Sequence, residues 1–383
     1  MPALLLFGDT VRNPTLRHEL PLVIGDPLAF IESDGRRVVL TSMLERDRIA
    51  HVLPDAELLD FNQFGFRELV LDGMTYSEAE RETVVRVADE LKIKHVLVPA
   101  DFPLALGDRL RAGGVALEIA EDLIEARRRV KSVSEMEGIR IAQRAAEAGM
   151  EAARDLLAHA APSTDGRLAI AGGTLLAEHV RAAIRTACAE HGAPAPPDIM
   201  VGSAWQGYGH DPGEGPLPAG MPIVIDLWPC HEATGCWADM TRTFLVGEPR
   251  PEHAQELAAR ERLVRTALEQ ARAAIRPGIT GRELHEATCD LFEAAGYSTQ
   301  RTSTEATQTD GFQFALGHGV GLEVHEAPAL SRAGRDPLVA GDVVAIEPGL
   351  YDDELGGVRF EDLVLVTEQG SETLTQFPYD LAP

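Results

Sequence analysis

The sequence predicts two domains, a smaller α/β domain followed by a larger α+β domain. Three observations carry this prediction. The chain has 383 residues, of which 45% are hydrophobic, and this is enough for two cores. Over residues 1–127, short apolar runs alternate with helical ones, as is typical of an α/β domain. Over residues 128–383, long helical stretches accompany β segments that indicate a mostly antiparallel sheet.

In the first domain, the stretch F-I-E-S-D-G-R-R-V-V-L predicts a β-hairpin with Asp34-Gly35 as its turn. The stretch R-E-T-V-V-R-V-A-D-E-L, which begins at Arg81, predicts an amphipathic helix. The next apolar run, H-V-L-V-P, predicts the strand that follows it.

The domain boundary is expected near residue 128, where the composition becomes strongly charged in A-R-R-R-V-K-S-V-S-E-M-E. Within this stretch Ser134 and Glu137 have the spacing of a capping box. A long helix should follow and run to about His159, and a second helical stretch should end near His191.

The second domain should then continue with a strand at I-M-V-G and a long loop over residues 203–220. That loop is rich in glycine and proline, contains His210, and is of a length that is usually functional or mobile. Two helices are expected at about 252–275 and 280–296. The remaining strands are predicted at I-V-I-D-L, D-M-T-R-T-F-L-V, V-V-A-I-E-P and V-R-F-E-D-L-V-L-V.

The formal net charge of -26 is concentrated in the second domain. Residues 1–130 carry 16 basic and 23 acidic side chains, a net of -7, and the remaining 253 residues carry 19 and 38, a net of -19. We therefore expect neither nucleic acid nor a membrane as a partner, since both attract basic surfaces. The only lysines are Lys92, Lys94 and Lys131, so a phosphate-binding loop with its lysine is excluded.

The compartment is expected to be the cytoplasm. Four cysteines in a chain this long do not form a disulfide framework. The first ten residues, M-P-A-L-L-L-F-G-D-T, lack the basic start and the long apolar run of a signal peptide. No stretch of about 18 apolar residues predicts a membrane span.

Two histidines lie in the glycine-rich stretch F-A-L-G-H-G-V-G-L-E-V-H-E-A-P. His318 and His325 are seven residues apart, and on a straight strand this spacing places them on opposite faces. A helix is disfavoured by the three glycines. Either the chain turns between the two histidines, or one binds a metal while the other faces a substrate.

Four carboxylates lie in strand-like apolar surroundings, where an unpaired charge is costly. They are Asp226, Asp239, Glu347 and Glu361. Such residues need either arginine partners or cations. Two divalent ions would balance four carboxylates, and Mn(II) or Co(II) accepts carboxylate and imidazole ligands together. A pair of ions about 3.5 Å apart could polarise a carbonyl and activate water.

With these residues in view, the sequence resembles the pita-bread metallopeptidases. This family includes Xaa-Pro dipeptidases (prolidases), Xaa-Pro aminopeptidases, methionine aminopeptidases and the metal-free creatinases. The resemblance covers residues 131–383, and the preceding part is similar to the smaller N-terminal domain of prolidases and creatinases. It implies a pita-bread catalytic domain, an antiparallel sheet flanked by helices, after a creatinase-type α/β domain.

The resemblance also implies roles for individual residues. Family members carry an Asp, Asp, His, Glu, Glu series in this chain order, and all five are present here. Asp226 would chelate one ion, His318 and Glu347 would hold the other, and two residues would bridge both. The bridging residues would be Asp239 and Glu361.

The other two histidines match family positions that contact substrate. His325 would face the transition state, and His210 would contact substrate from the long loop. Glu347 could also carry a proton to the leaving nitrogen. Arg359 lies two residues before Glu361 and would share its face on a strand, so it would either form an ion pair with a ligand or meet a substrate carboxylate.

The chain departs from the family in one spacing. The two aspartates are thirteen residues apart here, whereas eleven is frequent in the family. The intervening P-C-H-E-A-T-G-C is expected to form a hairpin tip lengthened by two residues. Cys230, His231 and Cys236 in this tip could form a zinc site or a disulfide, but exposed thiols are favoured.

The expected activity is hydrolysis of Xaa-Pro peptide bonds with two divalent metal ions, Mn foremost and Co or Zn as alternatives. Dipeptides are the favoured substrates, which makes the chain an Xaa-Pro dipeptidase. An Xaa-Pro aminopeptidase acting on longer peptides is the alternative. A non-catalytic pita-bread module that binds a peptide or protein is the alternative from another class. The resemblance implies a homodimer.

Overall fold

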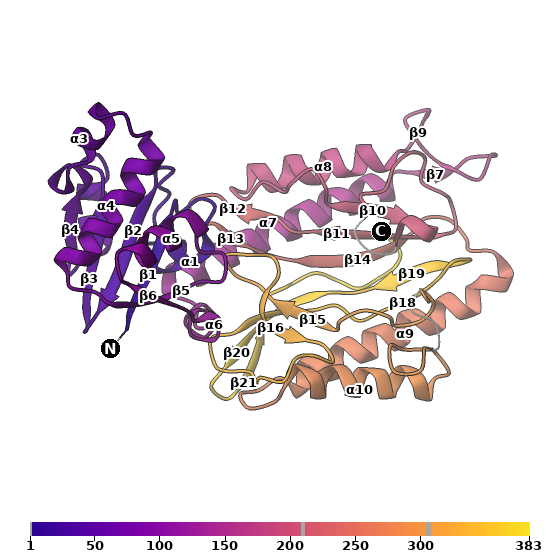
Figure 1. The fold of residues 1–383 in the computed structure, drawn as a ribbon. Coiled ribbons are helices and arrows are strands. Elements are labelled where there is room, and N and C mark those ends of the chain that lie inside the picture. The colour runs from indigo at the N-terminus through magenta and orange to yellow at the C-terminus, as the bar shows by residue number, and fades with distance from the viewer. Residues whose placement is uncertain (1, 208–210, 304–307) are drawn as a thin grey trace. The chain divides into compact units, whose positions relative to one another are not determined.

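A computed structural model describes residues 2–207, 211–303 and 308–383 of the chain. These residues group into two compact units. The first unit is Met1–Arg128 with Ala233–Gly235, and the second is Arg129–Glu232 with Cys236–Pro383. Figure 1 labels the elements of both units.

The smaller unit contains one six-stranded mixed sheet with the strand order β4-β3-β2-β1-β5-β6. Strands β1, β2 and β3 are joined antiparallel, while β4, β5 and β6 each pair in parallel with a neighbour. The predicted hairpin is confirmed, and its turn residues Asp34 and Gly35 have positive φ angles of 49° and 77°. The strands are β1 (Ala3–Gly8), β2 (Leu28–Ser33), β3 (Arg36–Thr41), β4 (Glu57–Asp60), β5 (His95–Val98) and β6 (Ala116–Ile119).

Helices cover both faces of this sheet, which confirms the predicted α/β architecture. Successive side chains of a strand point to opposite faces. Leu5 of β1 therefore joins one apolar core with Val84, and Leu6 joins another with Leu16. The helices are α1 (Pro14–Glu19), α2 (Arg46–Val52), α3 (Phe66–Leu71), α4 (Tyr76–Glu90), α5 (Leu104–Ala112), α6 (Glu121–Arg129) and the 3₁₀ helix η1 (Phe61–Phe64).

The larger unit is built on antiparallel sheets, as the sequence predicts. A three-stranded sheet has the order β10-β11-β14, and a five-stranded sheet has the order β16-β15-β17-β20-β21. Their strands are β10 (Met200–Ser203), β11 (Pro222–Leu227), β14 (Met240–Leu245), β15 (Gly317–Gly319), β16 (Glu326–Leu330), β17 (Val343–Ile346), β20 (Asp362–Thr367) and β21 (Gly370–Thr373). The smaller pieces are β7 (Ala161–Pro162), β8 (Leu168–Ile170), β9 (Gly173–Thr174), η2 (Ala204–Gly207), β12 (Cys230–His231), β13 (Cys236–Trp237), β18 (Gly349–Asp352) and β19 (Gly356–Arg359).

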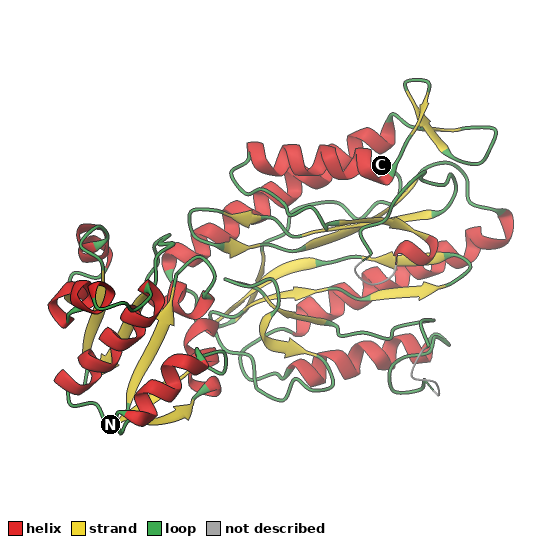
Figure 2. Ribbon diagram, turned by 45° about the horizontal axis from the view of Figure 1, so that its top comes forward, coloured by secondary structure: helices red, strands yellow, loops and turns green. Residues whose placement is uncertain are grey.

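Two pairs of long helices flank these sheets (Figures 1 and 2). In β17, Val343 and Ala345 face the core formed with α7 and α8, whereas Val344 and Ile346 face the core formed with α9 and α10. Both faces of the strand are therefore buried. None of the helices in the described part of the chain is long and apolar enough to cross a membrane. The helices are α7 (Val133–Ala158), α8 (Ala177–Glu190), α9 (Pro251–Ala274) and α10 (Gly281–Ala294).

Three details of the sequence prediction are wrong. The capping box of α7 is formed by Ser132 and Glu135, two residues before the predicted pair, because the helix begins at Val133. The short strands β7 to β9 were not predicted. The stretch V-R-F-E-D-L-V-L-V is not one strand, because β19 ends at Arg359, β20 begins at Asp362, and the two belong to different sheets.

The position of the capping box can be tested by substitution. Ser132→Ala removes the hydroxyl that accepts the Glu135 N–H at 3.2 Å, so it should lower the free energy of unfolding by about 1 kcal/mol. The control Ser134→Ala changes an exposed residue inside the first turn and should stay within about 0.5 kcal/mol of the parent. Urea denaturation measures both. A larger loss for Ser134→Ala would contradict the assignment.

Candidate active site

Two adjacent strands carry the two aspartates. Asp226 lies in β11 opposite Thr241 of β14, and Asp239 immediately precedes β14. Their chain neighbours Leu227 and Met240 face the core under α7 and α8. Because side chains alternate along a strand, both aspartates point to the opposite face of the sheet. Both are buried, with exposed fractions of 6% and 4%.

Glu361 lies in the short link between β19 and β20 and is held against β14. Its backbone N–H donates to the Thr241 carbonyl at 3.1 Å, and the Thr241 hydroxyl donates to its Oε2 at 2.7 Å. The buried Arg242 donates to the Glu361 carbonyl at 2.7 Å and to Asp362 at 2.9 Å. These bonds fix Glu361 beside the aspartates.

His318 occupies the middle of β15, between Gly317 and Gly319. Steric crowding explains why both neighbours are glycines. A Cβ atom at Gly317 would lie 1.9 Å from the carbonyl oxygen of Ala345 in β17. A Cβ atom at Gly319 would lie 2.2 Å from the carbonyl oxygen of Ala327 in β16. Any larger residue would force the strands apart. The motif G-H-G therefore places the imidazole in a tightly packed sheet.

The chain turns between His318 and His325, as one of the two sequence-based alternatives requires. Strands β15 and β16 run antiparallel, and the two imidazole rings meet nearly edge to face with centroids 4.2 Å apart. The residue after His325, Glu326, forms an ion pair with Lys131. Only 2% of the lysine side chain and 5% of the glutamate side chain are exposed. This buried pair, which was not predicted, anchors the end of the turn.

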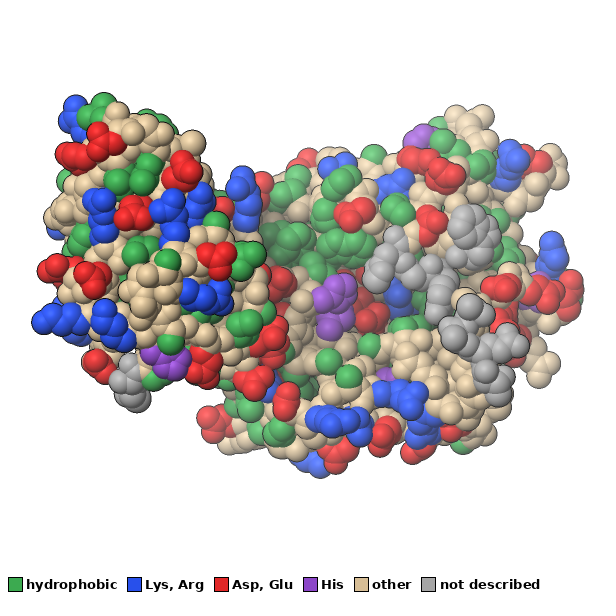
Figure 3. Space-filling view, viewed as in Figure 1, with side chains coloured by type: hydrophobic (Ala, Val, Ile, Leu, Met, Phe, Trp, Pro, Cys, Tyr) green, Lys and Arg blue, Asp and Glu red, His purple; other side chains and the backbone are tan. Residues whose placement is uncertain are grey.

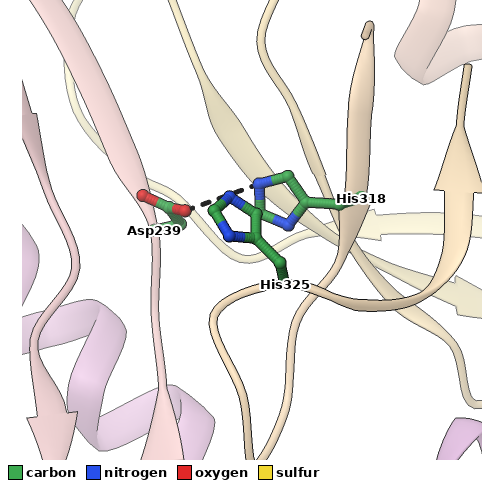
Figure 4. Close-up of side chains that lie close together, drawn as sticks. All are labelled: Asp239, His318 and His325. Atoms are coloured by element: carbon green, nitrogen blue, oxygen red, sulfur yellow. Dashed lines mark ion pairs between the residues drawn. The ribbon is translucent and has the colours of Figure 1, made fainter. Parts of the chain in front are cut away.

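The five predicted metal ligands come together in the structure. Within each of three groups, the ligand atoms lie within 4.8 Å of one another. Glu361 belongs to two of these groups, and Asp239 also belongs to two. Figure 4 shows the group of Asp239, His318 and His325, in which the Nε2 atom of His318 lies 3.6 Å from Oδ2 of Asp239. The groups are Asp226–Asp239–Glu361, His318–Glu347–Glu361 and Asp239–His318–His325.

These side chains line a cavity of about 410 Å³. In Figure 3, histidine and acidic side chains gather in a recessed part of the larger unit. The lining contains three residues that sequence reasoning missed, Asp198, Trp228 and Val324. His210, predicted to contact substrate, lies outside the described residues. The full lining is Asp198, Asp226, Trp228, Asp239, His318, Val324, His325, Glu347 and Glu361.

A family model described as metallopeptidase family M24 matches residues 137–368, which include every member of these ligand groups. The chain belongs to this metallopeptidase family. The match covers more than half of the chain and supports the resemblance seen in the sequence. Metallopeptidases of this family use divalent metal ions, and the ligand groups provide oxygen and imidazole donors for them.

The chain is similar to curated proteins over different lengths. It is 38% identical to the Xaa-Pro dipeptidase of Pyrococcus furiosus over 159 residues, 42% of this chain and 41% of that protein. It is 30% identical to the probable dipeptidase PepE of Mycobacterium tuberculosis over 288 residues, 74% of this chain and 68% of that protein. The first alignment thus spans less than half of the relative.

Solved structures show the same two-domain fold. The Xaa-Pro dipeptidase from Bacillus anthracis has a TM-score of 0.78 at 23% identity and covers 99% of this chain and 94% of that one. The X-Pro aminopeptidase from Thermotoga maritima has a TM-score of 0.77 at 23% identity, with coverage of 99% and 97%. The larger unit therefore has the pita-bread fold that the sequence predicts.

Burial and mutual repulsion raise the pKa values of Asp239, Glu347 and Glu361. Burial contributes most to the raised pKa of Asp239, and the charges of Glu361, Asp226 and Glu347 add to it. Burial also contributes most to the raised pKa of Glu361, followed by Asp226 and Glu347. For Glu347, burial raises the pKa to about 7. Without cations, ionising this cluster is costly.

Arg359 is the cation closest to these carboxylates. It forms an ion pair with Asp226, and its Nη1 atom lies 3.9 Å from Oε2 of Glu347. Its side chain is 5% exposed and is absent from the described cavity lining. The structure thus shows the ion pair with a candidate ligand, and contact of Arg359 with a substrate carboxylate stays a prediction. The argument that Arg359 shares a strand face with Glu361 is wrong, since β19 ends between them.

The residues fit divalent cations. One arginine cannot neutralise four carboxylates, so a net charge of about -3 is left when all four are ionised. Three of them, Asp226, Asp239 and Glu361, are buried, and Glu347 is half-buried. The Oδ1 atom of Asp226 is buried and has no hydrogen-bond partner among the described residues. Such an atom is costly unless something binds it. The donor set, four carboxylates and one imidazole, suits Mn(II), Co(II) or Zn(II).

The link between the aspartates forms the predicted hairpin tip. Strands β12 and β13 pair Cys230 with Trp237 and His231 with Cys236, and residues 232–235 turn between them. The expectation of exposed thiols is wrong for Cys236, which is fully buried in the core beneath α7.

The raised pKa values predict opposite effects of pH and metal on stability. In the unfolded chain, carboxyl groups have pKa values of about 4 and lose their protons above that pH. In the folded, metal-free protein, Asp239, Glu347 and Glu361 still hold their protons there, because their pKa values are raised. The contribution of the site to stability therefore falls as pH rises through the folded pKa, which is about 7 for Glu347. A divalent ion needs the ionised form and restores stability there.

The melting temperature should therefore rise more on Mn(II) addition at about pH 7.5 than at about pH 5.5. Differential scanning fluorimetry with a chelated reference at each pH measures this. The control Glu368→Gln removes an exposed carboxylate outside the cluster and should leave the difference unchanged. An equal metal-induced rise at both pH values would show that these carboxyls do not bind the ion.

Proposed function

We propose that this metallopeptidase hydrolyses the Xaa-Pro peptide bond with two divalent metal ions per chain, acting chiefly on dipeptides. One observation carries the proposal. Glu361 belongs to two groups of potential metal ligands, and these groups line the same cavity as His325. The names of similar proteins, an Xaa-Pro dipeptidase and a probable dipeptidase, support the substrate class.

In this proposal, Asp226 would hold one ion, His318 and Glu347 would hold the other, and two further carboxylates would contact both. The bridging residues are Asp239 and Glu361, each of which is shared between two of the ligand groups. When bound, the ions supply a Lewis acid for the scissile carbonyl and lower the pKa of water.

The remaining roles belong to side chains of the cavity. His325 is exposed to the cavity and would donate a hydrogen bond to the oxygen that becomes negative in the transition state. Glu347 would carry a proton to the leaving nitrogen, since it lines the cavity beside His318 at 3.7 Å. We also propose that His210 contacts substrate from the long loop.

One observation favours the second candidate, an Xaa-Pro aminopeptidase. Among the described residues that line the cavity there is neither a lysine nor an arginine. The proline carboxylate of a dipeptide would therefore find no cation on this wall, whereas a longer peptide carries a neutral amide there. In a dipeptidase, the metal ions or residues outside this cavity lining would have to neutralise the proline carboxylate.

Further properties follow from the family resemblance and the composition. We propose Mn(II) as the preferred ion, with Co(II) and Zn(II) as alternatives, because the donor set mixes carboxylates with imidazole.

We propose a homodimer, as the resemblance implies. We propose the cytoplasm as the compartment, since four cysteines in 383 residues suit a reducing compartment. We also propose residues 1–127 and 128–383 as the two domains.

Ligand variants test whether the site is catalytic. Glu361→Gln and Asp226→Asn should each lower kcat/KM by more than about 100-fold while the protein stays folded, because each removes a charge that the ions need. Glu368→Gln is the matched control and should keep full activity. Rates, circular dichroism and metal content should be measured together.

If the Glu361→Gln variant retained full activity with its metal bound, the assignment of Glu361 would be wrong. A purified wild type that binds no divalent ion and cleaves no peptide would instead support the non-catalytic peptide-binding module. About two equivalents of metal per chain support the enzyme.

A comparison of two substrates separates the peptidase alternatives. We expect cleavage of an Xaa-Pro dipeptide in Mn(II), and no cleavage in the chelated control. A tripeptide Xaa-Pro-Xaa with the same first two residues should be cleaved much more slowly by a dipeptidase. Equal or faster cleavage of the tripeptide would contradict the dipeptidase and support the aminopeptidase.

A further inference from the structure

We infer that Asp198 binds the protonated α-amino group of the substrate, with Trp228 forming the apolar side of the same subsite. This inference rests on the proposed function and extends it by assigning the residue that recognises the free amino end of the peptide. Neither residue belongs to a ligand group, and both line the cavity that contains the ligands.

The strand register brings the two residues to the same place. Met200, the first residue of β10, pairs with Asp226 of the antiparallel β11. Asp198 lies two residues before β10, and Trp228 immediately follows β11. The start of β10 and the end of β11 are therefore neighbours. Asp198 and Trp228 thus border the cavity near Asp226.

Charge distinguishes Asp198 from the other acidic residues of the cavity. The other four carboxylates of the lining all belong to ligand groups, and two divalent ions together with Arg359 would more than balance their charge. Asp198 has neither an ion pair nor a hydrogen bond to another described side chain, and it is exposed. With ions bound, its negative charge is left to attract a cation from the substrate.

A free peptide supplies this cation at its amino end. The α-amino group has a pKa of about 8 and is protonated at neutral pH. It lies one carbon away from the scissile carbonyl in an Xaa-Pro substrate, so it must sit beside the metal ligands when that carbonyl does. Trp228 packs against the core and presents an indole surface to the cavity, and such a surface attracts ammonium groups.

The test compares Asp198→Asn and Asp198→Glu with the wild type on four substrates in Mn(II). The substrates are Leu-Pro, N-acetyl-Leu-Pro, Lys-Pro and norleucyl-Pro. We expect Asp198→Asn to lower kcat/KM for Leu-Pro about tenfold or more, mainly through KM, and to leave the low rate on N-acetyl-Leu-Pro unchanged. Asp198→Glu should recover part of the loss, and metal content should stay at the wild-type level.

The pH profile gives a readout that a structural role would not change. In the wild type, kcat/KM for Leu-Pro should fall as the α-amino group loses its proton above about pH 8, and this decrease should be smaller in Asp198→Asn. An equal loss on the free and the acetylated peptide would overturn the inference, because Asp198 would then act on the fold or the metals.

Two other outcomes would also overturn it. An unchanged rate on Leu-Pro would show that Asp198 does not bind the amino group. A loss confined to Lys-Pro relative to norleucyl-Pro would assign Asp198 to the side chain of the first residue. The wild-type rates on the free peptides test the proposed function separately. If the wild type cleaves none of them, that function fails, and the inference fails with it.

Discussion

Mutual repulsion among buried carboxylates is the constraint on which the larger unit depends. Asp226, Asp239 and Glu361 form one group of close carboxylates, and Glu347 joins Glu361 in another. Arg359 pairs with Asp226 and lies 3.9 Å from Glu347, so this one arginine cannot neutralise all four. In isolation such a cluster would hold protons and weaken the fold at neutral pH. Divalent cations turn the same arrangement into a stabilising one, because they use the negative charge that the fold has concentrated.

The surrounding structure keeps the cluster from relaxing. Glu361 is fixed through both its backbone and its side chain to Thr241, and Arg242 holds its carbonyl. Gly317 and Gly319 allow the strands on either side of His318 to approach closely, which places the histidine in a tightly packed sheet. Such supporting contacts hold ligands in the geometry that a metal requires, so that little reorganisation is needed on binding.

Much of the fold, and the grouping of the five candidate ligands, could be predicted from the sequence. The aspartates and glutamates stand out because charged residues in apolar strand contexts are costly unless they are paired. The hairpin at Asp34-Gly35 was predictable because its turn needs positive φ angles. The capping box was misplaced by two residues, because serines at 132 and 134 each have a glutamate three residues later. Only the packing of α7 decides between them.

Contacts between distant parts of the chain could not be predicted in this way. Lys131 and Glu326 are 195 residues apart, and no local pattern connects them. Asp198 follows the stretch A-P-A-P-P, which has no hydrophobic periodicity. No sequence pattern therefore predicts that Asp198 lines the cavity. The apolar pattern continues through Arg359 and Glu361, and it therefore predicts that both share one face of a single strand. The break between β19 and β20 depends on two different sheets.

The most direct test of the account is anomalous diffraction from a crystal of the protein grown with Mn(II). The account predicts two manganese peaks per chain between the five side chains, one bound by Asp226 and the other by His318 and Glu347, with Asp239 and Glu361 contacting both. The absence of any peak among these residues at saturating Mn(II), or a single peak elsewhere, would contradict it.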